Sequence, residues 1–94
     1  MSDKYYYELY NELVEIVNEI RPYYSIDKIK TYSVYVWTKG DEGDPDDWGS
    51  NVFDIEADEI VYYDKEHKIA EEILPIIYKI QSKLKEIEYK KIGY

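Results

Sequence analysis

Ten carboxylates lie between Gly40 and Asp64 of this 94-residue chain, and no Lys, Arg or His lies among them. The rest of the chain has 11 of the 21 acids and all 12 bases, so its charges nearly cancel. The net charge of -9 therefore arises within the segment. Clustered carboxylates can hold a hard cation, act in acid–base catalysis, or present a negative surface to a basic partner. The ten are Asp41, Glu42, Asp44, Asp46, Asp47, Asp54, Glu56, Asp58, Glu59 and Asp64.

The first half of this cluster contains part of a calcium-loop pattern. Asp44 and Asp46 fit its first and third positions, but Trp48 occupies the fifth and Ile55 the twelfth, where a bidentate Glu is required. The segment is therefore not an EF-hand. Five carboxylates within residues 41–47 could still hold a hard cation loosely. The pattern requires neither a metal nor a cofactor, and we predict none.

No set of residues has the spacing of a catalytic site. Asp46 followed by Glu56 resembles the two-carboxylate metal site of restriction-type nucleases, but Asp58 stands where that chemistry uses a lysine. His67 is the only histidine, and no Ser, Cys or second His lies at a recognisable spacing from it. We interpret His67 as a surface residue in the first turn of a helix. The chain is therefore predicted not to be an enzyme.

Charge also argues against direct binding of nucleic acid or membranes. Lysines within residues 79–91 alternate with Tyr78 and Tyr89, but Glu86 and Glu88 interrupt this basic patch. The overall negative charge repels phosphate and points to a basic partner. No stretch approaches the roughly 20 apolar residues of a membrane span.

Composition predicts one folded domain over residues 1–94. The chain is 45% hydrophobic and 17% aromatic, which is too apolar for a disordered protein. It has no cysteine, and its N-terminus is charged where a signal peptide needs an apolar run. We expect a cytoplasmic protein, in the host cytoplasm if the chain is viral.

The N-terminal segment predicts an amphipathic helix over about residues 3–20, ended by Pro22. Its apolar positions recur every three or four residues: Tyr6, Leu9, Tyr10, Leu13, Ile16, Val17 and Ile20. The opposite side carries Glu8, Glu12, Glu15 and Glu19. No lysine follows these glutamates at the spacing of a helical ion pair, so local helix stability does not explain them.

Alternating residues predict strands over residues 31–37 and 51–57, paired as an antiparallel hairpin, while residues 23–30 are expected to form a loop. The alternation changes phase at Asp58-Glu59, which is either a bulge or a tight turn into a third strand.

A long C-terminal helix is expected after Asp64, kinked near Pro75 or divided there. The fold class is therefore α+β: an N-terminal helix, a two- to three-stranded antiparallel sheet and a C-terminal helix in chain order, with the helices covering one face of the sheet.

Two hypotheses of function follow, beside the simple alternative that the acids only keep the chain soluble. In the first, rows of carboxylates imitate phosphates and block a basic nucleic-acid-binding protein, with Trp48 as an apolar anchor. In size and charge the chain is similar to the DNA-mimicking anti-CRISPR and anti-restriction inhibitors of viruses, although it shares no family motif with them. The predicted partner-binding residues are Glu8, Glu12, Glu15, Glu19, Asp41, Glu42, Asp44, Asp46, Asp47, Trp48, Asp54, Glu56, Asp58 and Glu59.

The alternative function is that of a self-associating structural or adaptor protein. Thirteen tyrosines exceed what two helices and a small sheet can bury, and tyrosine is enriched at protein interfaces. A homodimer that joins two sheets or two first helices would cover them. The tyrosines in question are Tyr5, Tyr7, Tyr23, Tyr24, Tyr35, Tyr63, Tyr89 and Tyr94.

Overall fold

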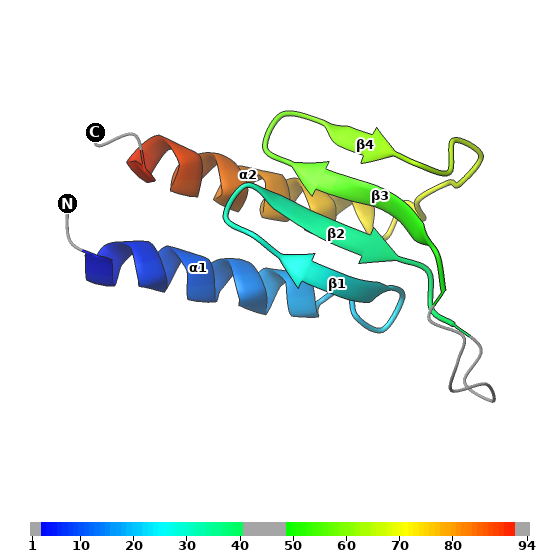
Figure 1. The fold of residues 1–94 in the computed structure, drawn as a ribbon, viewed down its shortest axis with the longest axis horizontal. Coiled ribbons are helices and arrows are strands. Elements are labelled where there is room, and N and C mark those ends of the chain that lie inside the picture. The colour runs from blue at the N-terminus through cyan, green and yellow to red at the C-terminus, as the bar shows by residue number, and fades with distance from the viewer. Residues whose placement is uncertain (1–2, 41–48, 92–94) are drawn as a thin grey trace.

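The computed structural model describes residues 3–40 and 49–91, and it shows an α+β fold (Figure 1). The sheet has four strands, one or two more than the sequence predicts. In chain order the elements are α1 (Asp3–Asn18), β1 (Ser25–Ile29), β2 (Ser33–Trp37), β3 (Asn51–Glu56), β4 (Ile60–Tyr62) and α2 (Leu74–Lys91).

The four strands form an antiparallel meander in the order β1-β2-β3-β4. Both helices lie on the same face of this sheet and run antiparallel to each other (Figure 1). Two side-chain hydrogen bonds join the layers: Tyr10 Oη donates to the Ile29 carbonyl at 3.0 Å, and Gln81 Nε2 donates to the Glu56 carbonyl at 3.2 Å. No helix of the described residues covers the other face of the sheet (Figure 1).

One hydrophobic core fills the space between the sheet and the helices. Val34 and Val36 of β2 face it together with their cross-strand partners Ile55 and Phe53 of β3. The helices contribute apolar residues at helical spacing, so each presents one continuous stripe to the sheet. The buried helical residues are Leu9, Leu13, Val17, Ile77, Ile80, Leu84 and Ile87.

β1 lies where the sequence predicts a loop. The register of β1 against β2 shifts between Ile26 and Lys28, so Asp27 is an extra residue in a bulge. Because of this bulge Ile26 and Ile29 both pack against the core although they are three residues apart. The bulge hides the two-residue periodicity by which a strand is recognised, and the loop prediction for residues 23–30 is wrong.

Asp58 and Glu59 form a tight turn, which is one of the two arrangements that their phase change allows. The Glu56 amide donates to the Glu59 carbonyl at 2.9 Å, and Ile60 then pairs with Ile55. The third predicted strand is confirmed as β4.

Pro75 does not kink a long helix, because α2 begins at Leu74 and Pro75 is its second residue. A separate turn precedes it, in which the Leu74 amide donates to the Ala70 carbonyl at 3.3 Å. A first-turn proline loses no helical hydrogen bond, since the first amides of a helix have no partner within it. The expected kink is therefore wrong, and the helix begins nine residues later than a cap at Asp64 implies.

Gly49 marks the return of the chain to the sheet. Its φ is +81°, and a Cβ there would lie 2.0 Å from the Thr38 carbonyl oxygen, so only glycine fits. The Thr38 amide donates to the Ser50 carbonyl at 2.8 Å, which joins the ends of β2 and β3. Within residues 3–40 and 49–91 no helix is long and apolar enough to cross a membrane.

The position of Pro75 predicts that Pro75→Ala changes the free energy of unfolding little, by less than about 1 kcal/mol. A proline that kinked a helix interior would cost about 3 kcal/mol, so its removal would stabilise the protein by a comparable amount. Ile77→Ala serves as the comparison, and it should cost about 2–5 kcal/mol because Ile77 is fully buried. Urea unfolding followed by circular dichroism measures both changes.

Candidate protein-binding surfaces

Four glutamates form an exposed row along α1. Packing of Leu9, Leu13 and Val17 into the core fixes the rotation of the helix, so the row always faces away from the sheet. We call Glu8, Glu12, Glu15 and Glu19 the α1 acidic row; all four are exposed.

Only one member of the α1 acidic row has a cationic partner among the described side chains. Lys83 Nζ lies 2.7 Å from Glu12 Oε2 and 3.1 Å from Glu86 Oε2. The hydrogen bond to Glu12, with a smaller contribution from Glu86, raises the pKa of Lys83, although partial burial opposes this shift. The raised pKa is consistent with a lysine that joins α1 to α2. Glu8, Glu15 and Glu19 are exposed and make no ion pair with a described side chain.

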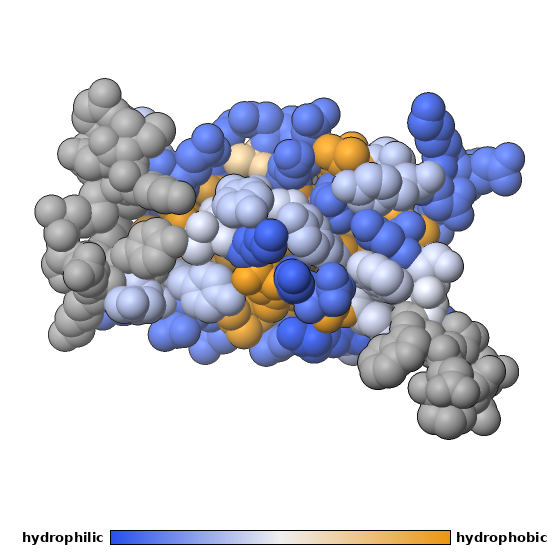
Figure 2. All heavy atoms as spheres, viewed as in Figure 1, coloured by the Kyte–Doolittle hydropathy of each residue, from blue (hydrophilic) through white to orange (hydrophobic). Residues whose placement is uncertain are grey.

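The second surface is the side of the sheet that no helix covers. Residues of β2 and β3 that alternate with the core positions must point to this side, and Tyr35 and Trp37 are the aromatic ones. Figure 2 views this side, where hydrophilic residues and residues of intermediate hydropathy surround hydrophobic atoms. The outer sheet face consists of Lys28, Lys30, Tyr32, Ser33, Tyr35, Trp37, Asp54, Glu56, Val61 and Tyr63.

The predicted partner-binding acids do not form one surface. The α1 acidic row belongs to the helical layer, whereas Asp54 and Glu56 belong to the outer sheet face on the opposite side (Figure 1). Asp58 and Glu59 are exposed in the β3–β4 turn, and Asp58 Oδ1 lies 3.2 Å from Lys85 Nζ. The remaining predicted residues, Asp41, Glu42, Asp44, Asp46, Asp47 and Trp48, lie outside the described residues.

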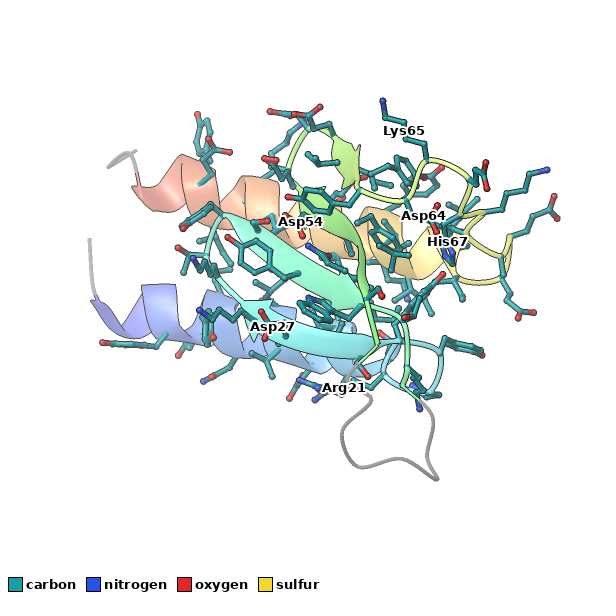
Figure 3. The ribbon with its side chains drawn as sticks, turned by 45° about the vertical axis from the view of Figure 1, so that its right-hand side comes forward. Arg21, Asp27, Asp54, Asp64, Lys65 and His67 are labelled. Atoms are coloured by element: carbon teal, nitrogen blue, oxygen red, sulfur yellow. The ribbon has the colours of Figure 1, made fainter. Side chains whose placement is uncertain are left out.

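Asp54 is a buried carboxylate at the centre of the outer sheet face (Figure 3). Only 7% of its surface is exposed, and its Oδ2 accepts a 2.7 Å hydrogen bond from Tyr63 Oη. Its Oδ1 is buried and has no hydrogen-bond partner in the structure. A buried carboxylate is costly unless donors surround it. Asp54 can therefore accept a further hydrogen bond from a cationic group.

Tyr63 responds to this carboxylate. Its hydroxyl donates to Asp54, which stabilises the protonated phenol and raises the pKa of Tyr63. The ring itself is 56% exposed, so it forms an aromatic border beside the acid.

A lysine lies on aromatic rings at the other side of the same face. Lys30 Nζ is 5.1 Å from the centroid of the Tyr35 ring and 5.5 Å from that of Tyr32. Its ammonium group also donates to Tyr32 Oη at 3.2 Å. The outer sheet face thus has Lys28 and Lys30 on its β1 side, next to the bulge residue Asp27, and carboxylates on β3, with the aromatic residues of β2 between them.

His67 is not the surface histidine at a helix start that the sequence suggests. It lies in the segment between β4 and α2 (Figure 3), its Nε2 is 2.6 Å from Tyr24 Oη, and its ring stacks on Phe53 with centroids 6.1 Å apart. Burial raises the pKa of Tyr24, which is only 6% exposed. His67 therefore closes one end of the core. The sequence carries no signal for this contact, because 43 residues separate the pair.

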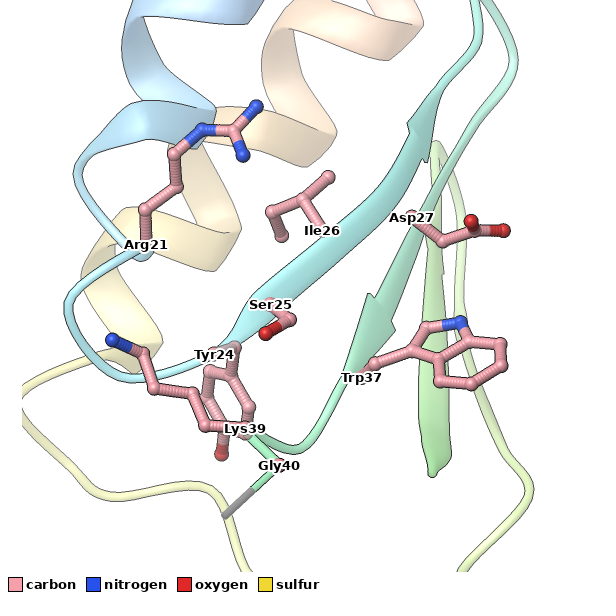
Figure 4. Close-up of a pocket in the computed structure, with 8 residues that line it drawn as sticks. All are labelled: Arg21, Tyr24, Ser25, Ile26, Asp27, Trp37, Lys39 and Gly40. Atoms are coloured by element: carbon pink, nitrogen blue, oxygen red, sulfur yellow. The ribbon is translucent and has the colours of Figure 1, made fainter. Parts of the chain in front are cut away.

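A hollow opens beside the start of β1, where Arg21 and Lys39 lie on one side of the strand and Asp27 and Trp37 on the other (Figure 4). Tyr24 and Ser25 also line this hollow. Among the described residues no three His, Cys, Asp or Glu side chains are grouped closely enough to hold a metal ion.

Comparisons of the chain with models of protein families, with curated proteins and with solved structures found no match.

Replacement of Asp54 by an uncharged residue should lower the pKa of Tyr63. In Asp54→Asn the phenol loses its charged acceptor, so the pKa of Tyr63 should fall toward its ordinary value near 10. Since the folded-state pKa is raised, the contact stabilises the protein below pH about 10, and this stabilisation disappears as the pH rises through the folded-state pKa.

Carbon-13 NMR of labelled tyrosine rings during an alkaline titration measures this shift. Glu59→Gln is the control, since it removes one nearby but exposed acid and should leave the titration of Tyr63 unchanged. An unaltered Tyr63 pKa in Asp54→Asn would show that the hydrogen bond does not form in solution.

Proposed function

We propose that this chain is a non-catalytic inhibitor that binds a basic nucleic-acid-binding protein and occupies the cleft where that protein holds phosphates. The observation that carries this proposal is the α1 acidic row, whose Glu8, Glu15 and Glu19 make no ion pair with a described side chain. The proposed partner surface is therefore cationic, and the chain itself contacts no nucleic acid.

The row carries its charges several ångströms apart along one line, as a phosphate backbone does, but at a wider spacing. At a rise of about 1.5 Å per residue the four glutamates extend over about 16 Å, or one charge per 5–6 Å. One strand of duplex DNA carries a charge about every 3.4 Å along the axis. The row thus offers a sparser charge than a phosphate strand, on a scaffold that needs no ordering when it binds.

Stability gives no reason for the row. Like charges one helical turn apart destabilise a helix by a few tenths of a kcal/mol per pair, and Glu19 opposes the helix dipole because it follows the last turn of α1. Among the four glutamates only Glu12 offsets part of this destabilisation, through its ion pair with Lys83. A surface that costs folding energy and holds its charge in one row is better suited to recognition than to solubility alone.

The test is capture of basic proteins by the immobilised chain. The probe is the heparin-binding fraction of a cell lysate, applied at about 0.05 M and about 0.5 M salt, since ionic contacts weaken as the Debye length shortens. We expect capture at low salt, release at high salt, and release by a competing DNA duplex. Capture that ignores both salt and DNA would contradict the proposal.

A matched pair of variants locates the contact. Replacement of Glu8, Glu15 and Glu19 by Gln should weaken capture about tenfold or more, if each exposed ion pair contributes about 0.5 kcal/mol. Glu12 is retained because it pairs with Lys83. The control replaces three other exposed glutamates by Gln with the same change of net charge, namely Glu66, Glu71 and Glu72. Equal loss in both variants would mean that net charge matters and the row does not.

A further inference from the structure

The geometry points to the outer sheet face as a homodimer interface, in which a two-fold axis parallel to β2 brings the lysines of one copy over the carboxylates of the other. This inference does not depend on the proposed inhibitor function, because it uses the opposite side of the molecule from the α1 acidic row.

The strand register aligns the charges in two rows across the sheet. In the first row Lys28 pairs with Tyr35, and Tyr35 pairs with Asp54. In the second row the Lys30 amide donates to the Ser33 carbonyl at 2.8 Å, and Ser33 pairs with Glu56. Each row therefore has a lysine on the β1 side, a β2 residue in the middle, and a carboxylate on β3.

This arrangement is complementary to itself under one rotation. Lysine and carboxylate lie one strand spacing, about 4.8 Å, on either side of β2. A half-turn about an axis along β2 exchanges the two sides and leaves the position along the strand unchanged. It brings Lys28 of the second copy over Asp54 and Lys30 of the second copy over Glu56. Symmetry repeats both contacts, which gives four ion pairs.

The other way to face two such sheets is unfavourable. A two-fold axis across the strands would lay β1 on β1 and β3 on β3, so lysines would oppose lysines and Asp54 and Glu56 would oppose their own copies. Like charges brought together across an interface are repulsive and select against that arrangement. The charge pattern therefore selects one axis.

Two further properties of this face fit a second copy. Asp54 Oδ1 is buried without a partner, and an ammonium group from the other chain supplies a donor once the exposed Tyr63 ring moves aside. Tyr32 is 58% exposed, and together with Tyr35 and Trp37 it provides the aromatic contacts that interfaces favour. Asp27, beside Trp37 in Figure 4, lies outside the two lysine rows.

Size and net charge make this dimer weak. With the axis along β2 only β1, β2 and β3 overlap, and three strands of about five residues give a contact of about 14 by 17 Å, which is small beside the roughly 800 Å² per partner of a standard interface. The charge of -9 on each copy opposes association, although screening at about 0.15 M salt limits this repulsion to about 8 Å.

Sedimentation velocity in about 0.15 M salt, from about 10 µM to about 1 mM protein, measures the association of an interface of this size. We expect a monomer–dimer equilibrium in the unmodified chain. Lys30→Glu and Glu56→Lys should each weaken it about tenfold or more, since either change turns two attractive contacts into repulsive ones. Lys68→Glu is the control, because it makes the same charge change as Lys30→Glu at an exposed residue outside the interface.

The decisive sample is an equimolar mixture of Lys30→Glu and Glu56→Lys. Each variant alone opposes like charges. In the mixed dimer both contacts are attractive again, because one keeps its original lysine and glutamate and the other has the two signs exchanged. We expect the mixture, and the double variant alone, to dimerise again. Circular dichroism shows whether each variant is folded.

A strict monomer at 1 mM in the unmodified chain would overturn the inference. So would a dimer that is insensitive to both substitutions, or two weakened variants that do not associate when mixed. The mixture shows whether the contacts form between copies or within one chain. A second variant can restore a contact between copies, but it cannot restore a contact within a chain.

Discussion

Packing of one face of the sheet against two helices is the interaction on which the other features of this molecule depend. Val34, Val36, Phe53 and Ile55 can be removed from water only by the apolar stripes of α1 and α2, because each layer is apolar on one side. That requirement fixes the rotation of α1 and therefore the direction of its glutamates. It also places both helices on the same side, so the reverse side of the sheet stays open. The two candidate surfaces are consequences of one core.

This division explains why the acids of α1 and of β3 differ in environment. Asp54 lies between two core residues of β3, so it must face outward, where Tyr35 and Tyr63 surround it. The glutamates of α1 lie in solvent, where the dielectric constant is high and each charge is tolerated singly. A carboxylate enclosed by aromatic rings gains from one well-placed donor, whereas an exposed row gains from a long complementary surface. The two surfaces therefore favour different partners.

Periodicity predicted the parts of the fold in which it is uninterrupted. Tyr6 to Ile20 repeats at helical spacing and Ser33 to Trp37 alternates strictly, so α1, β2 and the hairpin with β3 followed from the sequence. The sequence does not predict β1, because the bulge at Asp27 breaks the alternation. It predicts too long a C-terminal helix, because the apolar spacing continues through the turn before Pro75. The contact of His67 with Tyr24 depends on tertiary packing, which no local pattern records. For the site, the sequence identified the α1 acidic row, but it could not show that Asp54 and Glu56 face the other way.

The strand register, and not the composition, determines how the charges on the outer sheet face are arranged. Two lysines, two carboxylates and several aromatic residues on one face would be ordinary if their order were arbitrary. Here the bulge at Asp27 sets Lys28 in the row of Tyr35 and Asp54. Regular pairing continued from Ile26 would instead place Asp27 opposite Tyr35 and Lys28 opposite the core residue Val34. The irregularity that hid β1 from the sequence therefore also aligns its charges. A bulge interrupts the regular hydrogen bonds of a sheet, and bulges often serve to redirect side chains. The position of this bulge, next to the charged rows, therefore supports binding of a partner at this face.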